Sequence, residues 1–497
     1  MSADSSVPAE ADVVVVGFGA AGVATAIAAA EAGLSVAVLE KQPEDQHTPS
    51  VRMSGGLVMT VTDVHRATAY LDTCAQGMTP LAVTRTWAEW AARLRPWLER
   101  VCDDLRFQVM DVAEHREIDG YDAFAVLQQQ GERTTWAGPR TSGAAGAPPG
   151  TGRELFDSLR RAALARGVTI SWQRPAQRLV SAGGRVVGVR FGPGPDDVVR
   201  ARRGVVLASG GYEFDEPMKR NYLPATPICF YGNPGNTGDG IRMAQQVGAD
   251  LWHMNTMVGR AVMRVTRRDG QPHGLLVRIA PVGYVLTDTS GHRFMNEEKQ
   301  AELGHTVYYD LIPYDGEAHV HPRIPAYWFF DERRRQAGPL TPPSVGLVGV
   351  GQLAWDPDNT AQIESGLIPS GATVAAAAIA AGLAPEVART AAASVAAYND
   401  GCRTGTDEFG RRGESLVPID APPYYCVPLW PGGSNTCGGP RRDAAARVLN
   451  PFGEPIPGLY AAGEIGLVAG AWYPSAGANL SDAFCFGQIA VQSMLAG

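Results

Sequence analysis

The clearest chemical signal in the sequence is the glycine motif Gly17-Phe18-Gly19-Ala20-Ala21-Gly22, which has the spacing GxGxxG. Glycines at this spacing permit a tight turn and let backbone N–H groups approach a pyrophosphate. Glu40 ends the next apolar run and is followed by Lys41. A carboxylate at that place can accept hydrogen bonds from a ribose diol. The motif therefore predicts a dinucleotide site.

Three regular elements are needed to position these residues. Val13–Val16 is a β-branched run typical of a buried parallel strand, and Val23–Ala32 has the composition of a packed helix that ends at Gly33. Leu34–Leu39 is the second expected strand. Together they form a βαβ unit of about 30 residues. The N-terminus of its helix adds a partial positive charge that favours a phosphate.

Further motifs favour a flavin over a nicotinamide. The Glu40-Lys41 ending is common in flavoproteins, and Arg52–Gly56 offers a flat backbone for an isoalloxazine ring. A strand over Gly204–Ser209 enters a glycine turn, and Gly458–Gly466 forms another strand and turn. From these stretches the cofactor contacts expected are Ser54, Gly55, Gly56, Gly210, Gly211, Gly463 and Glu464, with Glu464 facing a ribityl or ribose hydroxyl.

The order of these stretches resembles the FAD-dependent fumarate reductase/3-ketosteroid dehydrogenase superfamily over nearly the full length. The similarity is carried by GFGAAG…LEK, RMSGG, VVLASGGYEFD, NTGDGIRMAQQVGADL, GHRFMNEE, AAYNDGCRTGTDEFGR and GLYAAGE. The resemblance implies one non-covalent FAD, with Asp239 near its adenosine side and Asn479 and Leu480 also at the cofactor. It also implies an α/β fold. In that fold, a Rossmann-type FAD-binding domain made from residues 1–255 and 419–497 carries an inserted α+β capping domain, residues 256–418.

Composition excludes several other classes of protein. The 497-residue chain has a formal net charge of −8, which disfavours a nucleic-acid partner. The sequence contains no run of 18 or more apolar residues, so we expect no integral membrane segment. The alanine-rich stretch Ala372–Ala384 is too short to span a membrane and predicts a packed helix. The seven cysteines form no CxxC pair, so we expect reduced thiols and no metal site. Without a secretory signal at the N-terminus, the expected location is cytoplasmic.

Two loops separate the branches of the superfamily. Fumarate-reducing members resemble one another in an HTMGG-like and an HGANRLGG-like motif, whose histidines and arginines hold a dicarboxylate. Here the corresponding stretches are Ser434–Gly439 and Trp472–Leu480, without those cations. The second stretch contains Tyr473-Pro474-Ser475-Ala476-Gly477, which is similar to the ketosteroid dehydrogenases. The resemblance implies that the Tyr473 hydroxyl and the Gly477 N–H bind a keto oxygen and stabilise an enolate.

Ser475 makes the motif look like that of the 3-ketosteroid Δ4-(5α)-dehydrogenases, in which a serine and a partner tyrosine remove the proton. Ketosteroid dehydrogenases carry a tyrosine shortly after an RFxNE segment, but none follows Arg293–Glu297 at that place. The candidates for the base or relay partner are therefore His305, Tyr308, Tyr309 and Tyr327, and histidine has the most suitable ordinary pKa. The alternative role for each is packing within the cap.

The leading hypothesis is FAD-dependent desaturation of a cyclic ketone to the enone, with a 3-keto-5α-steroid as first substrate and an unidentified electron acceptor. A small ketone such as cyclohexanone or 4-oxocyclohexanecarboxylate is the alternative, and a carboxylate would require an arginine of the cap. The arginines available are Arg260, Arg264, Arg267, Arg268 and Arg278. An enone reductase and a flavoprotein without turnover are further alternatives. A cleft could be lined by Trp328, Phe329, Phe330 and Trp472, although core packing is the commoner role.

Overall fold

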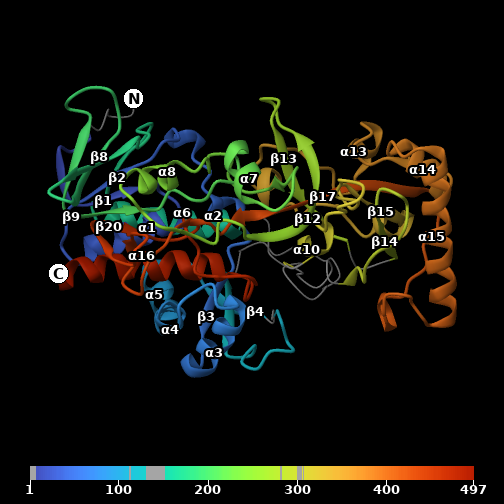
Figure 1. Ribbon diagram of the computed structural model, residues 1–497, viewed down its shortest axis with the longest axis horizontal. Helices are drawn as coiled ribbons and strands as arrows, with labels where there is room; N and C mark the ends of the chain where they lie inside the picture. The colour runs from blue at the N-terminus through green and yellow to red at the C-terminus, as the bar shows by residue number, and fades with distance from the viewer. Residues whose placement is uncertain (1–6, 111–113, 130–150, 280–282, 299–304, 306) are drawn as a thin grey trace.

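The computed structural model describes residues 7–110, 114–129, 151–279, 283–298, 305 and 307–497. It is a mixed α/β structure with one mostly parallel and one mostly antiparallel large sheet (Figure 1). Thr141–Gly152, whose glycine-, alanine- and proline-rich composition predicts a loop, lies outside the described residues apart from Thr151 and Gly152, which begin a helix.

The first large sheet contains the dinucleotide motif. Strand β1 (Glu10–Val16) pairs in parallel with β2 (Val36–Leu39) and with β9 (Val198–Leu207), and helix α1 (Ala20–Glu31) connects β1 to β2. The predicted βαβ unit is thereby confirmed. The remaining strands are β6 (Thr169–Ser171), β7 (Arg178–Ala182), β8 (Arg185–Arg190), β19 (Arg447–Leu449) and β20 (Pro455–Ala461).

Helices from distant parts of the sequence cover this sheet. Helix α16 (Ala478–Ala496) packs along α1 and carries a nearly continuous buried surface, because small and apolar residues occur on all its faces. In Figure 1 it is the long red helix beneath the sheet. Helix α6 (Thr151–Ala165) packs against α1, and it confirms the helix that the amphipathic pattern of Arg153–Gly167 predicts. The motif thus lies where both ends of the sequence meet.

The second large sheet lies beside the first and is built around a long strand. Strand β17 (Tyr424–Thr436) pairs with β12 (Met257–Thr266) on one side and β15 (Ala326–Asp331) on the other. Its other strands are β10 (Cys229–Phe230), β13 (Pro272–Leu276), β14 (Tyr284–Thr287) and β16 (Ser370–Gly371). The resemblance to the superfamily implied that residues 419–497 belong to the FAD-binding domain, whereas the long strand β17 pairs within the second sheet.

Smaller elements complete the structure. Strands β3 (Val58–Val61), β4 (Phe107–Met110) and β5 (Phe124–Gln129) form a three-stranded sheet, and β11 (Leu251–Trp252) pairs with β18 (Gly439–Pro440). The helices of the N-terminal half are η1 (Glu44–Gln46), α2 (Ser50–Met53), α3 (Val64–Ala75), α4 (Leu81–Ala91), α5 (Leu94–Val101), α7 (Glu216–Tyr222) and α8 (Asp239–Gln246).

Helices of the C-terminal half surround the second sheet. They are α10 (Tyr308–Leu311), α11 (Glu332–Gln336), α12 (Gly346–Gly349), α13 (Thr360–Glu364), α14 (Val374–Ala380), α15 (Pro385–Thr404) and η2 (Gly413–Ser415). The alanine-rich segment forms α14, which packs on α15 as expected for a buried helix. Trp328, Phe329 and Phe330 alternate between the two faces of β15 and fill core clusters, so they build the sheet and do not line the cavity described below.

Candidate active site

A large cavity extends from the carboxyl ends of the parallel strands to the second sheet. Val16 and Leu39, the last residues of β1 and β2, contribute to one end, and Val258 and Arg260 of β12 contribute to the other. Ligands of open α/β sheets bind at these strand ends. Predicted cofactor residues that line the cavity are Gly17, Gly19, Ala20, Ala21, Glu40, Lys41, Ser54, Gly55, Gly56, Gly210, Asp239, Gly463, Glu464, Asn479 and Leu480.

The glycine turn between β1 and α1 is closely packed. Gly17 has φ +96°, and a Cβ there would lie 2.6 Å from the Ala208 carbonyl oxygen. A Cβ on Gly22 would lie 2.1 Å from the Gly17 carbonyl oxygen, so Gly22 shapes the turn without lining the cavity. Helix α1 has no acidic residue in its first turn and no side-chain cap, which suits a phosphate at its N-terminus.

Glu40 and Lys41 lie in the cavity wall with partners of their own. The Glu40 carboxylate accepts hydrogen bonds from the N–H groups of Phe18 and Gln42, each over 2.9 Å. Burial raises the pKa of Glu40, but hydrogen bonds, chiefly from His47, hold it below its ordinary value. Lys41 Nζ lies 2.6 Å from Asp239 Oδ2 at the start of α8. These contacts join the two places predicted for the adenosine half of the cofactor.

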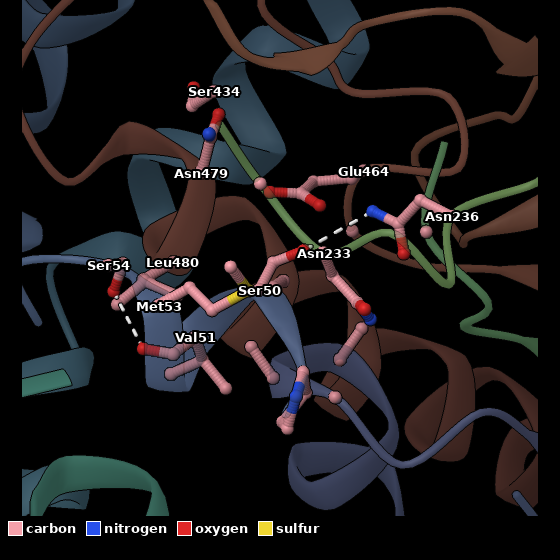
Figure 2. Close-up of a pocket in the computed structure, with 18 of the residues that line it drawn as sticks. Ser50, Val51, Met53, Ser54, Asn233, Asn236, Ser434, Glu464, Asn479 and Leu480 are labelled. Atoms are coloured by element: carbon pink, nitrogen blue, oxygen red, sulfur yellow. Dashed lines mark hydrogen bonds between the residues drawn. The ribbon is translucent and has the colours of Figure 1, made fainter. Parts of the chain in front are cut away.

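Glu464 is a second acidic group in the cavity wall. Figure 2 shows it beside Ser50 and Asn236, where Asn236 Nδ2 donates to Ser50 Oγ over 3.2 Å. Burial, together with the charge of nearby Glu213, raises the pKa of Glu464 to about 8. Glu213 is fully buried and accepts hydrogen bonds from the Thr436 N–H and hydroxyl. A protonated Glu464 can therefore donate as well as accept, which suits a ribityl or ribose hydroxyl.

A buried ion pair, which sequence reasoning missed, holds the turn that precedes Glu464. Arg442 Nη2 lies 2.6 Å from Asp482 Oδ1, and both side chains are fully buried. Asp482 also accepts hydrogen bonds from the N–H groups of Gly463 and Val468, over 3.2 and 3.0 Å. The sequence does hint at this pair, because Asp482 is an acidic residue within an otherwise apolar helix and a buried carboxylate requires a partner. The pair fixes the Gly463 turn against α16.

Tyr473 and Gly477 bring two hydrogen-bond donors to the wall of the same cavity. Within the described residues, the Tyr473 hydroxyl accepts a bond from the Asn479 N–H over 3.1 Å and donates to no protein acceptor. The Gly477 N–H, at the N-cap of α16, likewise has no acceptor within those residues, and φ of +83° favours glycine there. Both donors are therefore available to a ligand in the cavity.

His305 lies against Tyr473 in a group of buried ionisable side chains. The two rings have centroids 4.6 Å apart, and His305 Nδ1 lies 2.8 Å from Glu114 Oε1. His305 Nε2 lies 3.2 Å from Arg260 Nη2. Because a guanidinium only donates, Nε2 is the acceptor and Nδ1 carries the proton. Burial, followed by the charges of Arg260 and His115, holds the pKa of His305 well below its ordinary value.

Glu114 and Tyr70 complete the surroundings of this group. Burial raises the pKa of Glu114 well above its ordinary value, although the charge of Arg260 opposes the effect. Tyr70 donates to the carbonyl oxygen of Pro474 over 2.6 Å, and His115 Nε2 lies 3.1 Å from the Tyr473 carbonyl oxygen. The segment around Glu114 carried no recognisable motif, so its place beside His305 is a finding of the structure.

The other predicted catalytic side chains do not line the cavity. Ser475 is 3% exposed, and its hydroxyl is turned towards the Ala476 carbonyl oxygen at 3.4 Å. Tyr308 is fully buried beneath Gly259, and the Tyr309 hydroxyl donates to the Ala471 carbonyl oxygen over 3.0 Å.

Tyr327 lies on β15 and packs with α14 and α15. Gly211 contacts Thr436 and Glu213 behind the wall, and Trp472 stacks on His115.

The family follows from comparison with known sequences. A family model described as FAD binding domain matches residues 12–480. The chain belongs to this family. The glycine cradle, the N-terminus of α1 and the polar wall around Glu464 fit the diphosphate and hydroxyl groups of FAD, so the chain is a member of a family of FAD-dependent oxidoreductases. When bound, FAD supplies an acceptor for two electrons.

Relatives and solved structures agree with this assignment. The chain is 29% identical to the 3-oxosteroid 1-dehydrogenase of Mycobacterium tuberculosis over 97% of each chain. It is 28% identical to the 4-oxocyclohexanecarboxylate 2-dehydrogenase of Sinomonas cyclohexanicum, covering 96% of this chain and 92% of that protein. The fold matches the 3-ketosteroid Δ1-dehydrogenase from Sterolibacterium denitrificans with a TM-score of 0.82 and 24% identity, over 98% and 100% of the two chains.

Two other kinds of feature are absent from the described residues. None of the described helices combines the length and the apolar character that crossing a membrane would require. Among the same residues, no three His, Cys, Asp or Glu side chains are grouped so that they could hold a metal ion. The ionisable groups around His305 lie beside Tyr473 in the wall of the cavity.

Proposed function

We propose that this enzyme desaturates a cyclic ketone next to its carbonyl group, forming the α,β-enone. The observation that carries the proposal is the pair of unused donors, the Tyr473 hydroxyl and the Gly477 N–H, in the wall of a flavin cavity. An α C–H becomes acidic only when the developing negative charge on the carbonyl oxygen is stabilised. Removing one donor of such an oxyanion hole typically costs about 10²–10³ in rate.

His305 is the proposed base. Among the four candidates from the sequence it alone lines the cavity, and it is neutral at pH 7 because its pKa is lowered. Glu114 accepts from Nδ1–H and so keeps the lone pair on Nε2, the nitrogen nearer Arg260. The α proton would pass to His305 Nε2, and the C–H electron pair at the α carbon would be left to form the double bond. FAD, held by the glycine turn and the Glu464 wall, would supply the two-electron oxidant that takes up the β hydrogen with its electron pair. The two-electron balance is then complete.

The substrate proposed first is a monocyclic ketone. The Δ4-(5α)-steroid hypothesis depended on Ser475, and its hydroxyl is buried against the backbone, away from the cavity. The steroid relatives and the relative acting on 4-oxocyclohexanecarboxylate support a cyclic ketone as the general class. A 3-keto-5α-steroid is the second candidate substrate because of the steroid dehydrogenases among these relatives.

Anaerobic titration of the flavin-loaded enzyme tests the proposal. Cyclohexanone, 4-oxocyclohexanecarboxylate and 5α-androstane-3,17-dione are added separately while the absorption of oxidised flavin is followed. Bleaching by at least one ketone, with the matching enone as product, is the expected result. If none bleaches the flavin although dithionite does, ketone desaturation is refuted; re-oxidation of dithionite-reduced enzyme by cyclohex-2-enone alone would identify an enone reductase.

A further inference from the structure

Glu213 is an acid buried directly behind the wall of the flavin cavity. Its Oε1 atom accepts hydrogen bonds from the Thr436 N–H and hydroxyl over 2.7 and 2.9 Å. Its other oxygen, Oε2, has no hydrogen-bond partner among the described residues. The two donors on Oε1 favour the ionised form, because hydrogen bonds to a carboxylate stabilise its charge. Glu213 therefore brings a negative charge to the back of the cavity wall.

The glycine turn after β9 leaves the space that this carboxyl group occupies. A Cβ on Gly211 would collide with Glu213 Oε1, and a Cβ on Gly210 would lie 2.6 Å from Asn236 Oδ1. A larger residue at either position would therefore displace a polar side chain from the wall. Gly211, which was expected to contact the cofactor, instead makes room for a buried acid.

Glu464 lies on the cavity side of the same wall. Glu464 and Asn236 both line the cavity, and Figure 2 shows them next to each other beside Ser50. Burial raises the pKa of Glu213 and of Glu464, while the Asn236 amide lowers both, so this amide lies close to the two carboxyl groups. After burial, the charge of Glu213 is the next cause of the raised pKa of Glu464. Ionisation of one acid thus opposes ionisation of the other.

The turn that carries Glu464 packs against the glycine motif. A Cβ on Gly463 would lie 2.9 Å from the Cβ of Ala21, in the first turn of α1. The diphosphate of FAD is negatively charged, so an ionised Glu464 in the same cavity would oppose cofactor binding. Asp482 accepts a hydrogen bond from the Gly463 N–H, and its cation partner is Arg442. That guanidinium already serves one acid of this wall, and a protonated Glu464 removes the remaining repulsion.

We propose that FAD binding is linked to a single proton held by Glu213 and Glu464, with the charge on Glu213 and the proton on Glu464. Loss of this proton leaves two carboxylates at the wall and weakens cofactor binding. Glu213 does not line the cavity, so it acts as a positioning residue whose charge keeps the proton on Glu464. The inference concerns loading of the cofactor and does not depend on which ketone reacts.

The ionisable groups that face Glu464 come from several elements. They are Glu213 after β9, Cys437 after β17, Asp482 on α16, and Tyr473. Burial raises the pKa of Cys437 to about 12 and also raises that of Tyr473, so both stay neutral at pH 9. Asp482 is held in its ion pair with Arg442. A proton lost near pH 8 therefore belongs to the pair formed by Glu213 and Glu464.

Dilution of the holoenzyme measures this linkage directly. Serial dilutions of the FAD-loaded enzyme are equilibrated between pH 6 and 9.5, and released FAD is read from its fluorescence, with free FAD as standard at each pH. Wild-type Kd should be constant in acid and rise by about tenfold per pH unit above the pKa of about 8. In Glu464→Gln, which cannot ionise, Kd should not vary with pH. A wild-type Kd that is independent of pH would overturn the inference.

Glu213→Gln separates the proposed linkage from simple repulsion. If Glu213 only repelled the cofactor, removing its charge would tighten FAD binding at every pH. The proposed pair predicts instead that Glu464 loses its proton more easily, so the rise of Kd should begin at a lower pH than in the wild type. An onset that is unchanged or more alkaline would refute the role of Glu213. Asp239→Asn is the control, because this cavity acid has its own cation, Lys41, and its loss should leave the onset pH unchanged.

Infrared spectroscopy provides a second measurement that does not require Glu213→Gln to fold. A protonated carboxyl group has a C=O stretching band that a carboxylate lacks. The holoenzyme at neutral pH should show such a band, and Glu464→Gln should lose it. Identical spectra in this region for the two proteins would show that Glu464 carries no proton and would overturn the inference.

Discussion

The backbone N–H of Asn479 donates to the hydroxyl oxygen of Tyr473 over 3.1 Å. The first turn of α16 thus holds the tyrosine by its oxygen and leaves the phenolic proton for a ligand. Burial raises the pKa of Tyr473, although this hydrogen bond lowers it, so the hydroxyl stays protonated. One helix terminus therefore supplies both the anchor of Tyr473 and, at its N-cap, the Gly477 N–H.

Removal of the Tyr473 hydroxyl should lower the rate of flavin reduction by the ketone substrate with little effect on the fold. We expect Tyr473→Phe to reduce the rate of anaerobic flavin reduction by about 10²–10³, because one of two enolate donors is lost. Tyr309→Phe is the control, since that hydroxyl bonds the Ala471 carbonyl oxygen outside the cavity. An undiminished rate in Tyr473→Phe, with normal flavin content, would contradict the assigned role.

The pH profile should reflect a base with a lowered pKa. Neutral His305 is the active form, and its folded pKa lies well below 6.5. The rate of flavin reduction by cyclohexanone should therefore be flat around neutral pH and fall only in acid, as His305 becomes protonated. His305→Gln should lose the acid limb together with most of the rate. A wild-type rate that rises tenfold per pH unit between pH 7 and 9 would point to a different base.

Glu464 should make the flavin-free protein less stable at alkaline pH. Its folded pKa of about 8 exceeds the ordinary 4.5, so the folded state binds an extra proton between these values. Its contribution to stability is full below about pH 4.5 and is lost as pH rises through 8. Thermal unfolding of the flavin-free protein from pH 5 to 9 should show a decline that is smaller in Glu464→Gln. Superimposable curves for the two proteins would argue against a protonated Glu464.

The Arg442–Asp482 pair should be far more important for stability than a surface pair. Asp482→Asn leaves a buried guanidinium without its charge partner and should cost about 3–5 kcal/mol, seen as a lower denaturation midpoint. Flavin content should also fall, because asparagine offers a single oxygen to the Gly463 and Val468 N–H groups that now bind one carboxylate oxygen each. Asp400→Asn removes the partner of exposed Arg403 and should cost less than about 1 kcal/mol. Comparable losses in both variants would contradict this distinction.

Local sequence patterns predicted the elements that depend on neighbouring residues. The βαβ unit was predicted because β-branched runs, a packed helix and glycines lie within one short segment, and the structure confirms it. The strand and turn at Gly458–Gly466 were likewise predicted from neighbouring residues, and Gly463 and Glu464 line the cavity. The long strand β17 was not recognised, because prolines and glycines interrupt the apolar run Tyr424–Thr436.

Contacts between distant segments could not be read from the sequence. Glu114 and His305 lie nearly two hundred residues apart, and their contact joins the connection between β4 and β5 to the segment that precedes α10. The choice of His305 over Tyr308 likewise depends on the direction of a side chain, since Tyr308 packs beneath Gly259 while His305 lines the cavity. Residue type gave the candidates, and the tertiary structure decides among them.

The two walls of the cofactor cavity are made at very different times during synthesis of the chain. Residues 17–21 emerge early, whereas residues 463–483, which complete the same cavity, are translated after nearly everything else that surrounds it. A growing chain therefore exposes the strand ends of β1 and β2 without the helix that covers them. The complete cofactor cavity can therefore form only after residues 463–483 have been synthesised and α16 has packed along α1.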